Sequence, residues 1–196
     1  MKTIGKLTAV LMMVAISVLI TQEALGHAYR NPPPGAAALG RDGGDTADIR
    51  DASAVTHNPA NLTEIDGAAG LVTLTAIYGE SEYSGPSGMH SETEDPWKWL
   101  PAVYGVVPLQ SNILSAGIGV SAPYGQSTRW KNDMPFAGAA PYYARLQVVD
   151  VQPVIACRLA PSLSVAVGAD LYDSELELHQ LMPHAALGVP GPGAGT

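Results

Sequence analysis

The sequence predicts an all-β protein, an antiparallel transmembrane β-barrel that begins after an export signal. Hydrophobic residues alternate with small or polar ones in five segments, which is the pattern of strands with two different faces. The connections between these segments are alternately long and short, as in outer-membrane barrels. Aromatic residues gather near the long connections, where the interfacial girdle of a barrel is expected.

The composition argues against long helices and against nucleic acid as a partner. The 196 residues include 21 glycines and 16 prolines, although 46% of the chain is hydrophobic and 14% is charged. The net charge is −8, and because no basic stripe offsets it locally, a phosphate backbone would be repelled. The single cysteine, Cys157, excludes an internal disulfide and a multi-cysteine zinc site.

The N-terminus is typical of a secretory signal peptide. Lys2 and Lys6 precede the apolar run Leu7–Ile20, and small residues follow around Gly26 and Ala28, where a signal peptidase could cut. A membrane-spanning helix needs about 20 apolar residues, and this run is shorter. We therefore expect residues 1–26 to be a signal peptide, with cleavage after Gly26 or Ala28.

The five alternating segments are the predicted strands. In chain order they are Leu71–Tyr78, Leu100–Leu109, Leu114–Tyr124, Gln147–Arg158 and Leu163–Leu171. The third shows the pattern most clearly, because its even positions are apolar and its odd positions are Ser, Gly or Pro. Alternation by itself fits a β-sandwich as well as a membrane barrel, since either buries one strand face and leaves the other in water.

The connections favour the barrel. Gly79–Pro96 and Gly125–Tyr143 are long, whereas Gln110–Asn112 and Leu159–Ser162 are short, and a long segment begins at Asp173. Outer-membrane barrels have tight periplasmic turns and extended outer loops. The aromatic residues proposed for the girdle could instead pack loops of a secreted β-protein; they are Trp97, Trp99, Tyr124, Trp130, Tyr142, Tyr143 and Tyr172.

Three stretches resemble a known family. They are GDTADIRDASAVTHNPANL, ending at Leu62, LSAGIGVSAPYGQSTRW over Leu114–Trp130, and Val154–Gly168. They are similar to the FadL/TodX (OmpP1) family of outer-membrane transporters for long-chain fatty acids and aromatic hydrocarbons. The resemblance covers essentially the whole chain after the signal. It implies a 14-stranded antiparallel barrel plugged by an N-terminal hatch.

The resemblance also implies a division of the chain. Residues 27–68 would form the hatch, 69–173 the first five transmembrane strands, and 174–196 a truncated extracellular loop. Five strands cannot close a barrel, because single-chain bacterial barrels begin at eight strands. We therefore expect a fragment or a truncated reading frame of a transporter, and a non-functional fragment is one alternative.

Two features suggest a gate. In the resemblance, the Asn58-Pro59-Ala60 turn lies inside the barrel beside a kinked third strand; its alternative is a plain structural turn, for which Asn before Pro is a strong signal. In the third strand, Pro123 has no N–H to donate and Gly125 tolerates unusual backbone angles, so together they should open the ladder. Alternatively, the two residues only end the strand.

The expected ligand contacts come from the strand alternation and from the family resemblance. By the alternation, Ser121 points into the lumen, and it matches a family position that contacts the ligand's carboxylate. The family's cationic partner falls on or near His179, and a histidine there weakens the case for a carboxylate ligand. The segment with Leu178 and Met182 resembles the outer landing groove of the family, or it is a surface loop helix.

No enzymatic site is expected. The histidines show no metalloprotease spacing and have no neighbouring cysteines, so we predict no catalytic residue, metal or cofactor. The predicted function is passive diffusion of a fatty acid or aromatic hydrocarbon through a plugged barrel with a lateral exit, in the outer membrane of a Gram-negative bacterium. The partners would be this hydrophobic molecule and outer-membrane lipid. The main alternative is a secreted or periplasmic β-sandwich binding protein.

Overall fold

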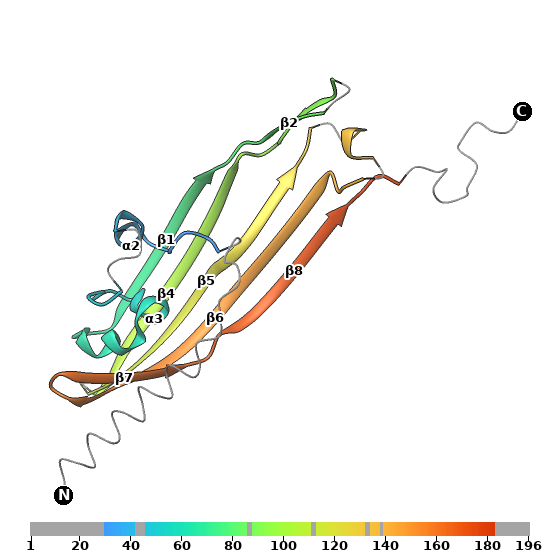
Figure 1. Ribbon diagram of the computed structural model, residues 1–196. Coiled ribbons are helices and arrows are strands. Elements are labelled where there is room, and N and C mark those ends of the chain that lie inside the picture. Colours follow the sequence, from blue (N-terminus) through green and yellow to red (C-terminus); the bar gives the residue numbers. More distant parts are fainter. Residues whose placement is uncertain are drawn as a thin grey trace, which may run out of the picture.

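The computed structural model is dominated by one tilted antiparallel sheet with short helices on one face (Figure 1). It describes residues 30–41, 46–85, 88–110, 113–131, 134–137 and 139–182, so the predicted signal peptide and its cleavage site lie outside the described residues. Within these ranges, no helix has both the length and the apolar character needed to span a membrane.

The predicted strands are confirmed. The sheet has the order β1-β4-β5-β6-β7, and β8 also pairs with β6. Two further short strands form a separate hairpin inside the connection expected to be a long loop. The bounds are β1 Ala69–Tyr78, β2 Glu82–Ser84, β3 His90–Glu92, β4 Trp97–Gln110, β5 Leu114–Arg129, β6 Tyr143–Ala160, β7 Leu163–Gly168 and β8 Leu171–His179.

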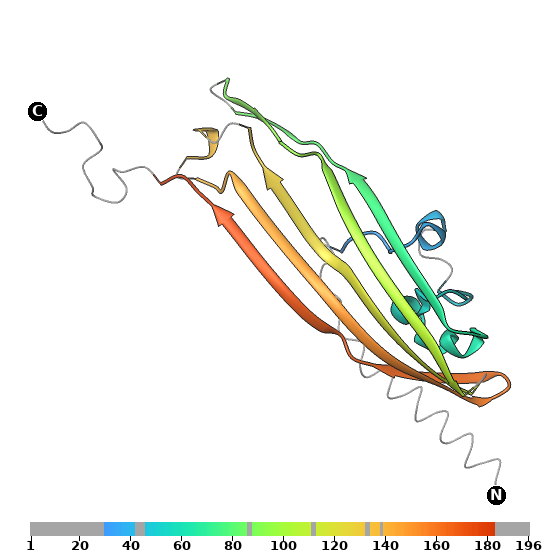
Figure 2. The ribbon, with the colours of Figure 1, turned by 180° about the vertical axis from the view of Figure 1, so that it is seen from behind.

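The helices cover one face of the sheet, called the inner face here. They are α2 Ala36–Gly40, α3 Ala54–His57 and the 3-10 helix η1 Pro59–Glu64, whereas the 3-10 turn η2 Met134–Phe136 lies in the connection between β5 and β6. Seen from behind, the strands lie in front of the helices (Figure 2). Residues 30–65 are called the hatch segment below. The sheet is not closed in the described residues, so β1 and the β7–β8 side are its edges.

Small residues on β5 make room for the hatch segment. A Cβ added to Gly117 would lie 2.7 Å from Val55 Cγ2 and 3.0 Å from Leu62 Cδ1. A Cβ on Gly119 would lie 2.9 Å from the Tyr104 ring. The glycines of the third predicted strand therefore let the hatch pack directly on the sheet. The resulting core contains Ile49, Ala52, Ala54, Val55, Leu62, Ile65, Ala102, Tyr104, Val106, Val154 and Ala156.

The other face, called the outer face, is apolar and exposed. Val72 is 75% exposed and Val167 is 73% exposed, and on β6 the outward apolar positions run from Val149 to Leu159. Ten residues of strand cover about 33 Å, which at a tilt of about 40° spans the roughly 25 Å apolar band of a barrel. In the described part of the chain no second sheet covers this face. The β-sandwich alternative is therefore not what the structure shows.

The fifth predicted strand is longer than expected. β7 and β8 share one register against β6, since Val154 pairs with Gly168 and Val151 pairs with Leu171. Between β7 and β8 this ladder is interrupted opposite Pro153, which has no N–H to donate, and a register shift between Arg158 and Ala160 lies near the turn. The predicted boundary at 173/174 is therefore wrong as a strand end: residues 174–179 continue β8 and are neither a loop nor a loop helix.

The residues predicted for the aromatic girdle do not all lie on one face. Trp97 and Trp99 are exposed on the outer face, where Trp97 contacts Tyr78 with ring centroids 5.1 Å apart. Tyr124 is different, because a bulge at Ala122–Pro123 sets two residues of β5 against one of β6. The bulge turns Tyr124 to the inner face, where it contacts Tyr172.

Candidate functional site

The wall of the sheet opens between β4 and β5. The last pair of their ladder is Val103 with Val120, and beyond it residues 97–102 of β4 remain paired with β1. Residues 124–129 of β5 remain paired with β6. Pro101 on β4 and Pro123 on β5 flank this divergence, and each lacks the N–H that a ladder needs. The gap between residues 97–102 and 121–128 is called the window.

The beginning of the hatch segment occupies the window. Asn31 donates its backbone N–H to the Pro123 carbonyl oxygen at 2.8 Å, and its side-chain Nδ2 donates to the Ala122 carbonyl oxygen at 2.7 Å. Arg30 forms an isolated antiparallel bridge with Tyr124. A short extended segment therefore takes the hydrogen bonds that β4 does not offer to β5.

The β2–β3 hairpin closes the window at its far end. Glu94 N–H donates to the Arg129 carbonyl oxygen at 2.7 Å, and Lys131 N–H donates to the Glu92 carbonyl oxygen at 2.8 Å. The Lys131 ammonium also pairs with the Glu92 carboxylate at 2.7 Å. This contact, with His90 as a second partner, lowers the pKa of Glu92, and it raises the pKa of Lys131.

A cavity of about 390 Å³ lies behind the window. Its walls come from the start of the hatch segment, from α3 and from the diverging strands. The lining is partly apolar and partly polar, as expected for a ligand site. The residues are Arg30, Asn31, Pro32, Pro33, Pro34, Thr46, Thr56, His57, Thr75, Leu100, Pro101, Ala102, Ser121, Ala122 and Pro123.

Two of the residues predicted from the third strand line this cavity. Ser121 is on the inner face and only 7% exposed, and Pro123 accepts the Asn31 hydrogen bond. Gly125 is outside the lining, but a Cβ there would lie 3.5 Å from Asn31 Nδ2. The strand continues to Arg129, so the alternative that Pro123 and Gly125 only end the strand is wrong.

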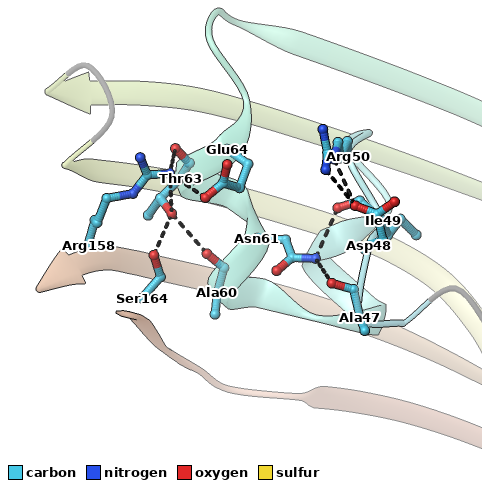
Figure 3. Close-up of polar contacts among 10 residues, drawn as sticks. All are labelled: Ala47, Asp48, Ile49, Arg50, Ala60, Asn61, Thr63, Glu64, Arg158 and Ser164. Atoms are coloured by element: carbon cyan, nitrogen blue, oxygen red, sulfur yellow. Dashed lines mark hydrogen bonds and ion pairs between the residues drawn. The ribbon is translucent and has the colours of Figure 1, made fainter. Parts of the chain in front are cut away.

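The Asn58-Pro59-Ala60 turn is next to the cavity, but its three residues are not among those that line it. It begins η1, with Pro59 in the first turn, and Asn58 Nδ2 donates to the Thr46 carbonyl oxygen at 3.0 Å. Asn61, directly after this turn, donates to the carbonyl oxygens of Ala47 and Ile49, both at 3.1 Å (Figure 3). Sequence reasoning missed Asn61, although a second Asn three residues after Asn58 is a visible signal. Both side chains hold the loop that precedes α3.

A polar cluster fixes η1 to the short-turn end of the sheet (Figure 3). Arg158 of β6 donates from one guanidinium nitrogen to the Thr63 carbonyl oxygen at 2.9 Å and to Glu64 Oε1 at 2.5 Å. The Thr63 hydroxyl lies 2.8 Å from the Ser164 hydroxyl on β7. The C-terminal part of the hatch segment is thus bonded to two strands.

The remaining predicted ligand residues are not brought to Ser121. Ser121 pairs with Asp150, which pairs with Tyr172, and His179 is seven residues further along β8. This is about 23 Å of strand. His179 pairs with Tyr143 and bonds Glu177 at 2.8 Å, so its predicted role as the cation beside Ser121 has no geometric basis here.

Leu178 and Met182 are near the end of β8 rather than in a loop groove. Leu178 pairs with Ala144 and belongs to the inner face together with Leu176 and Leu146. Met182 follows β8 and is 58% exposed. Within the described ranges, no group of three or more His, Cys, Asp or Glu side chains could hold a metal ion.

Comparison with known proteins identifies the family. A family model described as outer membrane protein transport protein (OMPP1/FadL/TodX) matches residues 17–195. The chain belongs to this family. Among solved structures it is similar to a Pseudomonas aeruginosa FadL homologue, with 17% identity and a TM-score of 0.58. No curated protein matches the chain significantly.

The FadL homologue is a β-barrel, and at this identity the likeness concerns the fold. The match covers 76% of this chain and 38% of that one, so the chain spans less than half the length of the solved relative. The open sheet with its hatch segment thus has the fold of a FadL-family barrel wall. The family is one of outer-membrane transport proteins for hydrophobic compounds and not an enzyme family.

Proposed function

We propose that the chain serves in the outer membrane of a Gram-negative bacterium as part of a transporter for hydrophobic compounds, fatty acids or aromatic hydrocarbons. The compound enters the cavity beside Ser121 and leaves sideways through the window into lipid. In this proposal the compound moves by passive diffusion down its gradient, without an energy source. The hatch segment blocks direct passage along the inner face.

The interrupted β4–β5 ladder is the observation that carries this proposal. An unpaired strand edge facing lipid costs several kcal/mol per backbone group, so an interruption in the wall of a membrane protein needs a compensating device. Here Asn31 provides the hydrogen bonds, and a cavity lies directly behind. The outer face around the window is apolar, with Trp99 and Val103 exposed, so an emerging hydrocarbon would meet acyl chains and not water.

Closing the window chemically tests the lateral exit. Cysteines replace Leu100 and Pro123 in a Cys157→Ser background, and a short bis-maleimide joins them. Uptake of radiolabelled toluene into outer-membrane vesicles should fall at least about fivefold after crosslinking. The matched control is a cysteine pair at Val103 and Val120, where the ladder is already closed, and its crosslinking should leave uptake unchanged.

A second variant avoids the crosslinker. Replacing Pro123 and Gly125 together with Val allows the ladder to form more fully, because Val donates an N–H and favours extended backbone. We expect slower hydrocarbon uptake with intact folding. Unchanged uptake in both the crosslinked and the double-Val protein would exclude the window as the exit.

A further inference from the structure

The inner face beside Ser121 carries a buried acidic side chain that the transport proposal does not use. Asp150 is directly opposite Ser121 on β6, and directly opposite residues point to the same face with Cβ atoms about 5 Å apart. Asp150 is 5% exposed, and its Oδ1 atom has no hydrogen-bond partner in the described structure. A buried, unpaired carboxylate oxygen is costly unless something donates to it.

Two further polar side-chain atoms near Asp150 are also buried without a hydrogen-bond partner. The side-chain oxygen of Gln152, two residues along β6, is buried without a partner. The Tyr104 hydroxyl is buried and close enough to the hydroxyls of Thr56 and Ser121 to interact with them, but neither has the geometry of a full hydrogen bond to it. Gln152 and Tyr104 are both opposite Gly119, one on each side. Three polar groups with unused bonding capacity therefore lie around Gly119 and Ser121, next to the cavity that Ser121 lines.

An apolar surface continues from this polar group along the inner face. Val148 and Leu146 follow Asp150 on β6, and Leu146 is opposite Leu176 on β8. Leu176 and Leu178 are 64% and 54% exposed. The rings of Tyr124 and Tyr172 lie between this patch and Asp150, with centroids 6.3 Å apart. The arrangement fits a molecule with one polar end and an apolar or aromatic body.

The charge at the polar end disfavours a carboxylate ligand. Two negative charges about 4 Å apart repel by roughly 1 kcal/mol in water and about 4 kcal/mol at a protein surface. Asp170 and Asp51 add negative charge in the neighbourhood. The basic side chains of the cavity, Arg30 and His57, belong to the hatch segment. Arg30 is exposed, and the His57 ring is within 3.4 Å of the Pro34 carbonyl oxygen.

We infer that the site beside Ser121 selects hydrophobic molecules whose polar end is a neutral hydroxyl, such as phenols and long-chain alcohols, and disfavours carboxylates. The hydroxyl donates to Asp150 and accepts from Ser121 or Tyr104, because a hydroxyl can do both. The ring or chain lies on Tyr124, Tyr172 and Leu176. This inference rests on the proposed transport function and specifies its substrate class.

Three probes that share the methyl-substituted benzene ring test it: toluene, 4-methylphenol and 4-methylbenzoate. Dissociation constants are measured by equilibrium dialysis with the full chain in lipid nanodiscs at neutral pH, after subtraction of partitioning into empty nanodiscs. The wild-type protein should bind 4-methylphenol about tenfold more tightly than toluene, the effect of one hydrogen bond to a charged group. It should bind 4-methylbenzoate more weakly than either.

Variants assign the preference to Asp150. Asp150→Leu should remove the preference for 4-methylphenol over toluene, and Asp150→Asn should retain much of it while improving 4-methylbenzoate binding severalfold. Asp173→Leu and Asp173→Asn are matched controls, because Asp173 pairs with Val149 on the outer face, and they should change neither ratio. If Asp150→Leu does not fold, the asparagine variant and the wild-type probe series decide.

The outcomes separate this inference from the transport proposal. If toluene binds and crosses but 4-methylphenol is not preferred, or 4-methylbenzoate binds best through Arg30, the substrate class is wrong and transport stands. If none of the three probes binds or crosses, the transport function fails, and the substrate class fails with it.

Discussion

Asn31 bonds two consecutive carbonyl groups of β5, through its backbone to Pro123 and through its side chain to Ala122. Both carbonyls belong to the part of β5 that has no β4 partner, because the β4–β5 ladder ends at Val103–Val120. One residue of the hatch segment therefore completes the edge of a wall strand. The contact joins two parts of the chain 91 positions apart.

Replacing Asn31 with Ala should loosen the window. The backbone bond to Pro123 can persist, but the side-chain bond to Ala122 is lost, which typically costs about 1 kcal/mol. We expect faster toluene uptake by the vesicles, by about two- to fivefold, with little change in global unfolding. Asn61→Ala is the control, since Asn61 bonds the carbonyl oxygens of Ala47 and Ile49, which do not line the cavity, and has no bond to β5 among its hydrogen bonds here. Equal acceleration in both variants would argue against a specific role for Asn31.

Gly117→Ala should destabilise the packing of the hatch segment. The new Cβ would lie 2.7 Å from a methyl group of Val55, which is stiff because it is β-branched, and overpacking of this kind costs about 1–3 kcal/mol. Urea unfolding in detergent micelles measures the loss. Gly105→Ala is the matched control, because its Cβ would have no neighbour closer than 3.9 Å.

A rescue variant checks the cause of that loss. Val55→Ala removes the clashing methyl groups, so the double variant Gly117→Ala/Val55→Ala should be less destabilised than the sum of the two single changes. Strict additivity would mean that Gly117 matters for the backbone of β5 and not for contact with the hatch segment.

Arg158→Met should release η1 from the sheet while keeping most of the side-chain length. The variant loses hydrogen bonds to Thr63 and Glu64, and we expect a loss of about 1–2 kcal/mol together with faster amide exchange in residues 60–65. Glu64→Gln should cost less than about 1 kcal/mol, because the Glu64 side chain is half exposed. Exchange that is unchanged in Arg158→Met would show that apolar packing alone holds η1.

Docking of the β2–β3 hairpin should depend on pH. Lys131 and His90 lower the pKa of Glu92 in the folded protein. The ionised Glu92 carboxylate therefore stabilises hairpin docking fully at a pH above its pKa in the unfolded chain. This stabilisation is lost as the pH falls through its lower pKa in the folded protein. Glu92 raises the pKa of Lys131. The stabilisation of docking by the Lys131 ammonium is therefore lost as the pH rises through this raised pKa. Both groups are at the surface, and added salt should weaken the effect.

Trp130 reports this docking, because its ring packs against Tyr83 of β2 and against Phe136. Fluorescence of Trp130, with Trp97 and Trp99 changed to Phe, should show an acid transition below the usual range of a glutamate. Lys131→Met should move that transition upward. A transition that stays in place would assign it to another group.

The strands and their two faces could be predicted from the sequence, because alternation with a period of two is a local property. Gly117 and Gly119 show the limit: their small size was visible, but the partners that require it, Val55 and Tyr104, are far away in the sequence. The interruption at Pro123 was also predicted, whereas Pro101, its counterpart on β4, was not singled out.

The candidate ligand residues were only partly predictable. The inward direction of Ser121 was predicted correctly because Ser121 precedes the bulge, where odd-numbered residues of β5 still face inward. Three further residues were predicted to lie in a loop: His179, Leu178 and Met182. β8 forms because it pairs with β6 in the register that β7 also uses, and this long-range pairing leaves no local signal in the sequence. Asp150 and Asn31 were missed because an acidic strand residue and an Asn before three prolines look ordinary until their neighbours are known.

The bulge at Ala122–Pro123 reverses the phase of β5. Before it, even-numbered side chains face outward; after it, Tyr124, Gln126 and Thr128 face inward, opposite Val148, Leu146 and Ala144. The extra residue is what keeps these three side chains on the inner face, because Tyr124 lies opposite Val148 only when two residues of β5 share the place opposite Val149. Deleting one of the two bulge residues would give a regular ladder and leave Tyr124 opposite Val148, so the faces would not change. The same one-codon deletion elsewhere in β5 would turn every side chain on one side of it to the opposite face, and it should therefore be more damaging than a deletion at the bulge.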